Sequence, residues 1–250
     1  MSSANTADTA DTAKTATAYA TSPASTAGVD RRRVLRATGI GGIVAFAFWL
    51  LQPLLVFVVM NGDQETTPRY ELYKASPYLG AYEAITFGAV GVGTIVMVIG
   101  VYALARLGSA DALAARVAAV LGSVAGAGWL AAAGLSLGMF TSVGYFVTDE
   151  VPARADQAAV YSAIDLVLTG ALVVYGLAMI CWLAWMASGA RRAGVVGWPL
   201  AVLAIVAAVA ACSPLVVPFA PPIGALGALV FSLVFGIVCL VRARTAGRRV

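Results

Sequence analysis

The stretch AAVYSAIDLVLTGALVVYGLAMICWLAWMA, residues 158–187, decides the fold class of this chain. A helix needs about 20 predominantly apolar residues to cross the hydrocarbon core of a bilayer. This apolar stretch exceeds that length and contains one charged residue, Asp165. The stretch therefore predicts a membrane-spanning helix, and Asp165 is a candidate functional residue because a charge inside a span is costly.

Five further apolar runs of similar length predict a bundle of membrane helices. The chain is 61% hydrophobic and 11% charged, whereas soluble domains are about 45–50% apolar and about 25% charged. We therefore expect an all-α, polytopic transmembrane bundle within residues 31–242. The predicted spans cover residues 38–60, 82–105, 113–140, 158–187, 197–217 and 222–241.

The end of the fifth run is rich in proline and has two interpretations. Pro214, Pro218, Pro221 and Pro222 lie in or just after the end of this run. Proline most simply ends a helix and makes a tight external turn there. A re-entrant pair of short helices is the alternative.

The distribution of basic residues predicts the orientation of the bundle. Lys and Arg collect in the short cytoplasmic loops of membrane proteins. With the N-terminus inside, only Arg69, Lys74 and Arg154 lie outside, which leaves 13 of the 16 basic residues (16 − 3) on inside segments. We therefore expect six spans with both termini in the cytoplasm, a plasma-membrane location, and a basic cytoplasmic tail over residues 243–250.

The N-terminal segment differs in composition from the rest of the chain. Residues 1–30 consist mainly of Ala, Thr and Ser, and such a segment cannot bury enough apolar surface to offset its ordering entropy. We expect a disordered cytoplasmic tail there. The stretch from Asp30 to Arg36 resembles a twin-arginine export signal. Cytoplasmic anchoring of the first span is favoured over export, because the apolar run behind it is long enough to span.

Composition excludes several classes of site. The chain contains no His, which removes His-ligated metal and haem sites and Ser-His or Cys-His catalytic pairs. Cys181, Cys212 and Cys239 each lie in an apolar segment without C-x-x-C spacing. The arginines flank apolar runs instead of forming one basic face, which argues against nucleic acid. We therefore predict no catalytic residue, cofactor or metal ligand, and the lipid bilayer as the principal partner.

Small residues in the second and third spans predict how these spans pack. The third span contains Gly122-x-x-x-Gly126 and Gly134-x-x-x-Gly138, and the second is also rich in glycine. Small residues let membrane helices approach closely. We expect residues 82–105 and 113–140 to form an antiparallel pair. Homo-oligomerisation or binding of a membrane protein partner through these motifs is the alternative.

Polar residues near the outer ends of the spans form a candidate site. Tyr161, Asp165 and Thr169 are four residues apart and share one helix face. Gln52 on the first span lies at a depth comparable to that of Asp165, and Glu83 is shallower, at the mouth of the second span. These five residues could line an outward-facing polar vestibule. The favoured alternative is that Asp165 makes an interhelical or interfacial hydrogen bond. If Trp182 and Trp185 form an inner aromatic belt, Asp165 lies close to the outer surface.

The C-terminal part of the chain resembles a group of known sequences. Ser188-Gly189-Ala190-Arg191-Arg192 and Gly197-Trp198-Pro199-Leu200 precede two Ala/Val-rich spans. This arrangement loosely resembles uncharacterised bacterial integral membrane proteins with six or seven helices, a group that supplies no activity. A structural or partner-binding membrane subunit is the first functional hypothesis. A small-solute or ion transporter with the vestibule as its site is the second, and a membrane-embedded enzyme is the third.

Overall fold

The computed structural model describes residues 23–54, 78–108, 111–146, 155–212 and 221–246, and every element in these ranges is helical. The helices follow the chain as α1 (Pro23–Leu54), α3 (Leu79–Leu107), α4 (Ala112–Phe146), α5 (Ala155–Trp185), α6 (Trp198–Ala211) and α8 (Pro221–Ala246). A π-helical turn, η3 (Met186–Ala190), continues α5. The described part of the chain is thus all-α, as predicted.

Among the described residues, five helices are long and apolar enough to cross a membrane: α1, α3, α4, α5 and α8. The fifth predicted span, residues 197–217, is represented by α6, which has 14 residues and is therefore about 21 Å long. A bilayer core is about 30 Å thick. Because proline disfavours helix in the residue before it, Pro214 limits how far α6 can extend. The count of six spans accordingly stays a prediction.

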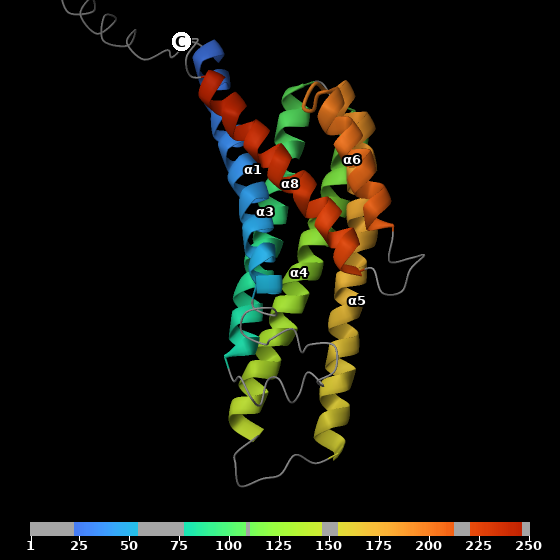
Figure 1. Cartoon of the computed structure of the whole chain (residues 1–250). Helices are drawn as coiled ribbons and strands as arrows, with labels where there is room; N and C mark the ends of the chain where they lie inside the picture. The colour runs from blue at the N-terminus through green and yellow to red at the C-terminus, as the bar shows by residue number, and fades with distance from the viewer. Residues whose placement is uncertain (1–22, 55–77, 109–110, 147–154, 213–220, 247–250) are drawn as a thin grey trace, which may run out of the picture.

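The helices form a closed ring in which each packs on its neighbours. In chain order, α1 packs on α3, α3 on α4, α4 on α5, α5 on α6, and α6 on α8. Helix α8 then returns across the bundle to pack against α1, so that the first and last helices lie side by side (Figure 1). Helix α6 runs along only part of α5, whereas α4 and α5 form the longest arm of the bundle (Figure 1).

Reciprocal glycine pairs set the closest approaches between neighbouring helices. A Cβ on Gly91 would lie 2.8 Å from the carbonyl oxygen of Gly126, and one on Gly126 would lie 2.9 Å from that of Gly91. The predicted antiparallel pairing of the second and third spans, now α3 and α4, is therefore confirmed. Gly41 and Gly93 join α1 to α3 in the same way, each Cβ position lying 2.7 Å from the other's carbonyl oxygen.

Aromatic side chains fill the space that the ring encloses. Trp182 on α5 meets Phe231 on α8 edge-on at 6.0 Å between ring centroids, and Phe231 stacks on Phe235 at 5.7 Å. Trp182 is fully buried, so its expected place in an aromatic belt at the headgroups is wrong. Its edge-on contact with Phe231 helps to hold the Trp182 ring inside the bundle, whereas Trp185 remains half-buried.

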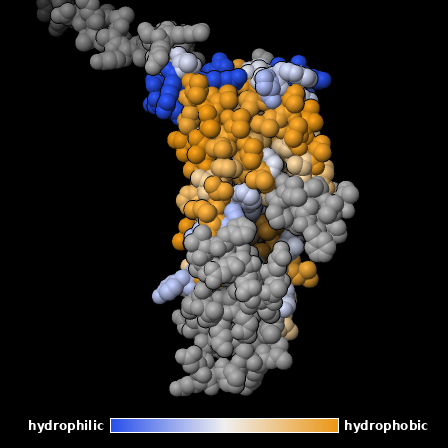
Figure 2. Space-filling view, viewed as in Figure 1, coloured by the Kyte–Doolittle hydropathy of each residue, from blue (hydrophilic) through white to orange (hydrophobic). Residues whose placement is uncertain are grey.

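Arginine side chains gather at one end of the bundle. The start of α4, the ends of α3 and α8, and the segment between α5 and α6 all lie at the end where the α1 arginines lie (Figure 1). Hydrophilic side chains cap this end above a broad apolar band (Figure 2). Because α1 begins at Pro23, its first eight residues overlap the tail predicted over residues 1–30, and residues 1–22 and 247–250 lie outside the described residues.

Candidate functional site

The end of α1 is tied to the start of α3 by side-chain hydrogen bonds. The Gln52 amide nitrogen Nε2 donates to the Thr86 hydroxyl oxygen. The Thr86 hydroxyl lies 3.0 Å from the Tyr82 carbonyl oxygen and 3.1 Å from that of Glu83. The Tyr82 hydroxyl donates to the carbonyl oxygen of Leu51 at 2.8 Å. Gln52 therefore works as a link between two helices.

Glu83 lies inside the bundle, between α3 and α4. Its side chain is 1% exposed, and that of Ser136 is fully buried. The Ser136 hydroxyl donates to Glu83 Oε2 at 3.1 Å. Burial of an acid without a partner is strongly unfavourable, so this hydrogen bond from α4 helps to accommodate the carboxyl group. Glu83, expected at the mouth of its span, is instead a core residue.

The remaining vestibule residues all lie on α5. Thr169 is exposed. The side chains of Asp165 and Tyr161 lie outside the described residues, although the helix that carries them is described. The structure therefore brings Gln52 and Glu83 into one cluster, with Thr86 and Ser136 as the residues that join them to neighbouring helices.

Ser136 was missed in the sequence, although a signal for it exists. Glu83 lies 26 residues before Ser109, and Ser136 lies 26 residues after Ala110 (109 − 83 and 136 − 110). Residues at equal distances from a short turn lie opposite each other in an antiparallel helix pair, since the rise per residue is the same in both helices. Counting outward from the turn would have placed Ser136 beside Glu83.

The polar cluster lines neither of two hollows found elsewhere in the described bundle. One, of about 380 Å³, lies between α5, η3 and α6, and the other, of about 260 Å³, lies at the arginine end. The Gln52 hydrogen bond joins α1 to α3, and the Glu83 hydrogen bond joins α3 to α4. Their arrangement can hold helices in register, and a buried carboxyl group can in principle also carry a proton.

The described residues offer few ligands for a metal or cofactor. No group of three or more His, Cys, Asp or Glu side chains in these ranges could hold a metal ion. The three cysteines are free thiols, with Cys181 exposed, Cys212 half-buried and Cys239 buried. The buried Cys239 is a small apolar packing residue.

Comparisons with protein-family models, with curated proteins and with solved structures give no match for this chain. The resemblance to uncharacterised bacterial membrane proteins therefore stays an expectation from sequence.

Proposed function

We propose that this chain is a multi-pass plasma-membrane protein with both termini in the cytoplasm, and that it acts as a partner-binding membrane subunit. The arginine-bearing end of the bundle supports the orientation, because basic side chains prefer the cytoplasmic side. The closed polar cluster supports a structural interior. The proposal of six passes rests on residues 197–217 crossing the bilayer together with α8.

The proposal of a partner rests on the residues exposed on the outward face of α4. Exposed residues on this face recur at alternating spacings of three and four, the period of a helix-packing seam. The first four are large: Leu113, Val117, Val120 and Val124. Beyond them small exposed residues continue at the same spacing, beside the exposed Leu130 and Leu137. We call the small residues the α4 stripe: Ala127, Ala131, Gly134, Gly138 and Thr141.

Small residues at this spacing suit a second helix better than lipid. Helices associate in membranes through close backbone contact, and their interfaces are enriched in Gly, Ala, Ser and Thr. A Cβ added at Gly134 would meet no heavy atom within 4 Å, so the small size of this residue serves no packing within the described chain. The α4 stripe is thus shaped for a helix of another subunit or of a second copy.

Photo-cross-linking in intact membranes tests the partner proposal. A photoreactive residue in place of Ala131 should give a cross-linked species of one defined mass. Gly134→Ile should abolish this species, because a branched side chain separates the two backbones. The mass separates a second copy of this 25.5 kDa chain from a different subunit.

Gly170→Ile on α5 is the matched control. Gly170 is also exposed, and a Cβ there would likewise have no heavy atom within 4 Å. This variant should retain the cross-linked species. Cross-links to lipid alone, or equal loss in both variants, would contradict a partner at the α4 stripe.

Transport of protons or ions is the second candidate function, and the burial of Glu83 favours it. An ionisable residue within a membrane bundle marks ion and proton pathways in many transporters. If Glu83 carries a proton, vesicles containing the protein should show a pH-driven flux that Glu83→Gln removes. A flux that is equal for the variant and the native chain would exclude Glu83 as the carrier.

A further inference from the structure

Two hollows of different chemistry meet at Ser188. The first is a groove with an almost wholly apolar lining, made by Ile180, Ala184, Ala187, Ser188, Ile205, Ala208, Val209 and Cys212. The second is a polar pocket at the arginine end, lined by Asp111, Ala114, Trp185, Ser188, Gly189, Arg192 and Ala193. Ser188 belongs to both linings, so the apolar groove and the polar pocket adjoin at this residue.

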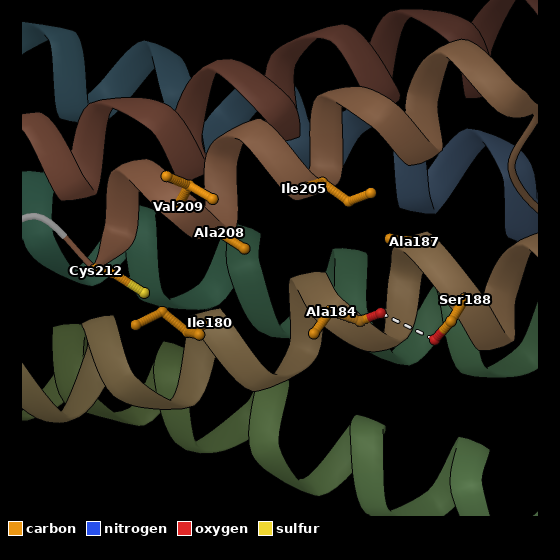
Figure 3. Close-up of a pocket in the computed structure, with 8 residues that line it drawn as sticks. All are labelled: Ile180, Ala184, Ala187, Ser188, Ile205, Ala208, Val209 and Cys212. Atoms are coloured by element: carbon orange, nitrogen blue, oxygen red, sulfur yellow. Dashed lines mark hydrogen bonds between the residues drawn. The ribbon is translucent and has the colours of Figure 1, made fainter.

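The apolar groove has the dimensions and position of an acyl-chain site. Cys212 lies opposite Ile180 at one end, while Ile205 and Ala187 lie toward the other (Figure 3). Along α5 the groove extends from Ser188 to Ile180, eight residues or about 12 Å. One leaflet of a bilayer core is about 15 Å thick. The groove therefore extends through most of one leaflet.

The polar pocket holds one cation and one anion. Asp111 Oδ1 accepts hydrogen bonds from the backbone N–H groups of Leu113 at 2.9 Å and Ala114 at 3.4 Å, which fixes the carboxylate at the start of α4. Arg192 reaches the pocket from the segment after α5. Within the described chain no ion pair joins Arg192 to Asp111. Both charges are therefore available to a ligand.

The neighbouring arginine is engaged elsewhere, which leaves Arg192 as the cation of the pocket. The Arg191 guanidinium lies over the Trp198 ring, 4.4 Å from its centroid, a favourable cation–π geometry. Trp185, in contrast, lines the pocket, and its indole lies against Gly189, where a Cβ would collide with the ring. An indole N–H is a hydrogen-bond donor that suits the headgroup region.

The π-helical turn shapes the junction of the two hollows. Residues Met186–Ala190 form η3, and Ser188 lies at its centre, with its hydroxyl donating to the Ala184 carbonyl oxygen at 3.0 Å. π-Helical turns are rare and are frequently found at functional sites. The turn contributes Ala187 and Ser188 to the groove and Ser188 and Gly189 to the pocket.

We propose that this composite site binds one phospholipid with a phosphoethanolamine headgroup, its phosphate at Arg192, its ammonium at Asp111 and one acyl chain in the apolar groove. Guanidinium binds phosphate through paired charged hydrogen bonds, and a primary ammonium donates hydrogen bonds to a carboxylate. A purely anionic headgroup would meet the Asp111 carboxylate. The lipid comes from the leaflet at the arginine end, which is cytoplasmic in the proposed orientation.

Lipid retention tests the site directly. The full chain is placed in nanodiscs containing equal parts of phosphatidylethanolamine, phosphatidylglycerol and phosphatidylcholine with identical acyl chains. After extraction in mild detergent, native mass spectrometry counts the bound lipids. The native chain should retain one phosphatidylethanolamine in preference to the other two. Arg192→Gln should weaken this retention about tenfold, the effect of losing one charged hydrogen-bonded contact.

Asp111→Asn provides a variant that keeps the fold. Asparagine caps a helix about as well as aspartate, so α4 should begin at the same place. Removal of the negative charge should shift the preference toward phosphatidylglycerol. In the groove, Ala208→Phe should lower the retention of every lipid, while Val206→Phe, an exposed residue of α6 outside the lining, should not.

Several outcomes would overturn the proposal. These are equal retention of phosphatidylglycerol by the native chain, an unchanged preference in Asp111→Asn, and an effect of Arg192→Gln no larger than that of Arg244→Gln, which changes an arginine outside the pocket. A dimer that Ala208→Phe dissociates would mean that a second copy fills the groove. None of these readouts depends on the α4 stripe, so the lipid site and the partner proposal can fail separately.

Discussion

At the scale of single residues, the pair Glu83 and Ser136 determines how an acid is tolerated inside an apolar bundle. The carboxyl group is 1% exposed and accepts a hydrogen bond from the hydroxyl on the neighbouring helix. Interhelical hydrogen bonds between membrane helices average about 0.6 kcal/mol and reach about 1.7 kcal/mol. Because both partners here are buried, we expect a coupling above this average, of about 1 kcal/mol.

A double-mutant cycle measures this coupling. Ser136→Ala, Glu83→Leu and the double variant are unfolded by sodium dodecyl sulfate in mixed micelles. Ser136→Ala should lower the free energy of unfolding by about 1 kcal/mol. With Glu83→Leu present, the same substitution should have little further effect. Additive effects of the two substitutions would show that the hydrogen bond contributes nothing measurable.

The sequence predicted single residues with mixed success, for a physical reason. Gln52 and Glu83 were identified because polar side chains inside apolar runs stand out against lipid-facing neighbours. Ser136 did not stand out, because a single serine costs little inside a membrane span. Its importance depends on a partner on another helix, which the sequence of its own span does not show. Trp182 was misplaced for a related reason: a tryptophan near a helix end suits either a headgroup belt or a core, and only the packing of α8 decides.

At the scale of elements, the backbone contact between Gly91 and Gly126 sets the distance between α3 and α4. Any side chain at Gly91 would press on the Gly126 carbonyl oxygen, and overpacking of this kind typically costs about 1–3 kcal/mol. Gly91→Val should therefore lower the free energy of unfolding by about 2 kcal/mol. Denaturation in mixed micelles provides the measurement.

Gly176→Val on α5 is the control for this prediction. A Cβ at Gly176 would have no heavy atom within 4 Å, so its effect should stay within about 0.5 kcal/mol, as for most surface substitutions. Similar losses of stability from both variants would mean that the effect comes from replacing a glycine within a helix. The contact between the two helices would then not be responsible.

Helix lengths were predicted well where the apolar run was uninterrupted and less well near proline. The apolar runs that correspond to α3, α4 and α5 contain no proline, and their predicted lengths agree with the observed spans. The run at residues 197–217 corresponds to a helix that ends at Ala211. Hydropathy continues past this point, but the backbone restriction before Pro214 does not appear in a hydropathy profile.

At the scale of the whole molecule, the arrangement of helices predicts a testable topology. Green fluorescent protein fused to either end of the chain should fluoresce in cells, because it folds in the cytoplasm. Alkaline phosphatase fused after Gly62 or within residues 213–220 should be active, because it needs the outer side. Phosphatase activity at either terminus would reverse the proposed orientation. Inactivity after residue 213 together with activity after Gly62 would leave five passes or a re-entrant hairpin.

The contact of α8 with α1 has a consequence for synthesis of the chain. Gly39 and Gly236 approach through their backbones, each Cβ position lying 2.8 Å from the other's carbonyl oxygen, although nearly 200 residues separate them (236 − 39 = 197). The first helix leaves the ribosome long before the helix it fits. During that interval its glycine face has to rest against lipid or the insertion machinery. If translation stopped before residue 221, α8 would be missing and the glycine face of α1 would stay uncovered. Quality-control proteases could recognise this exposed face.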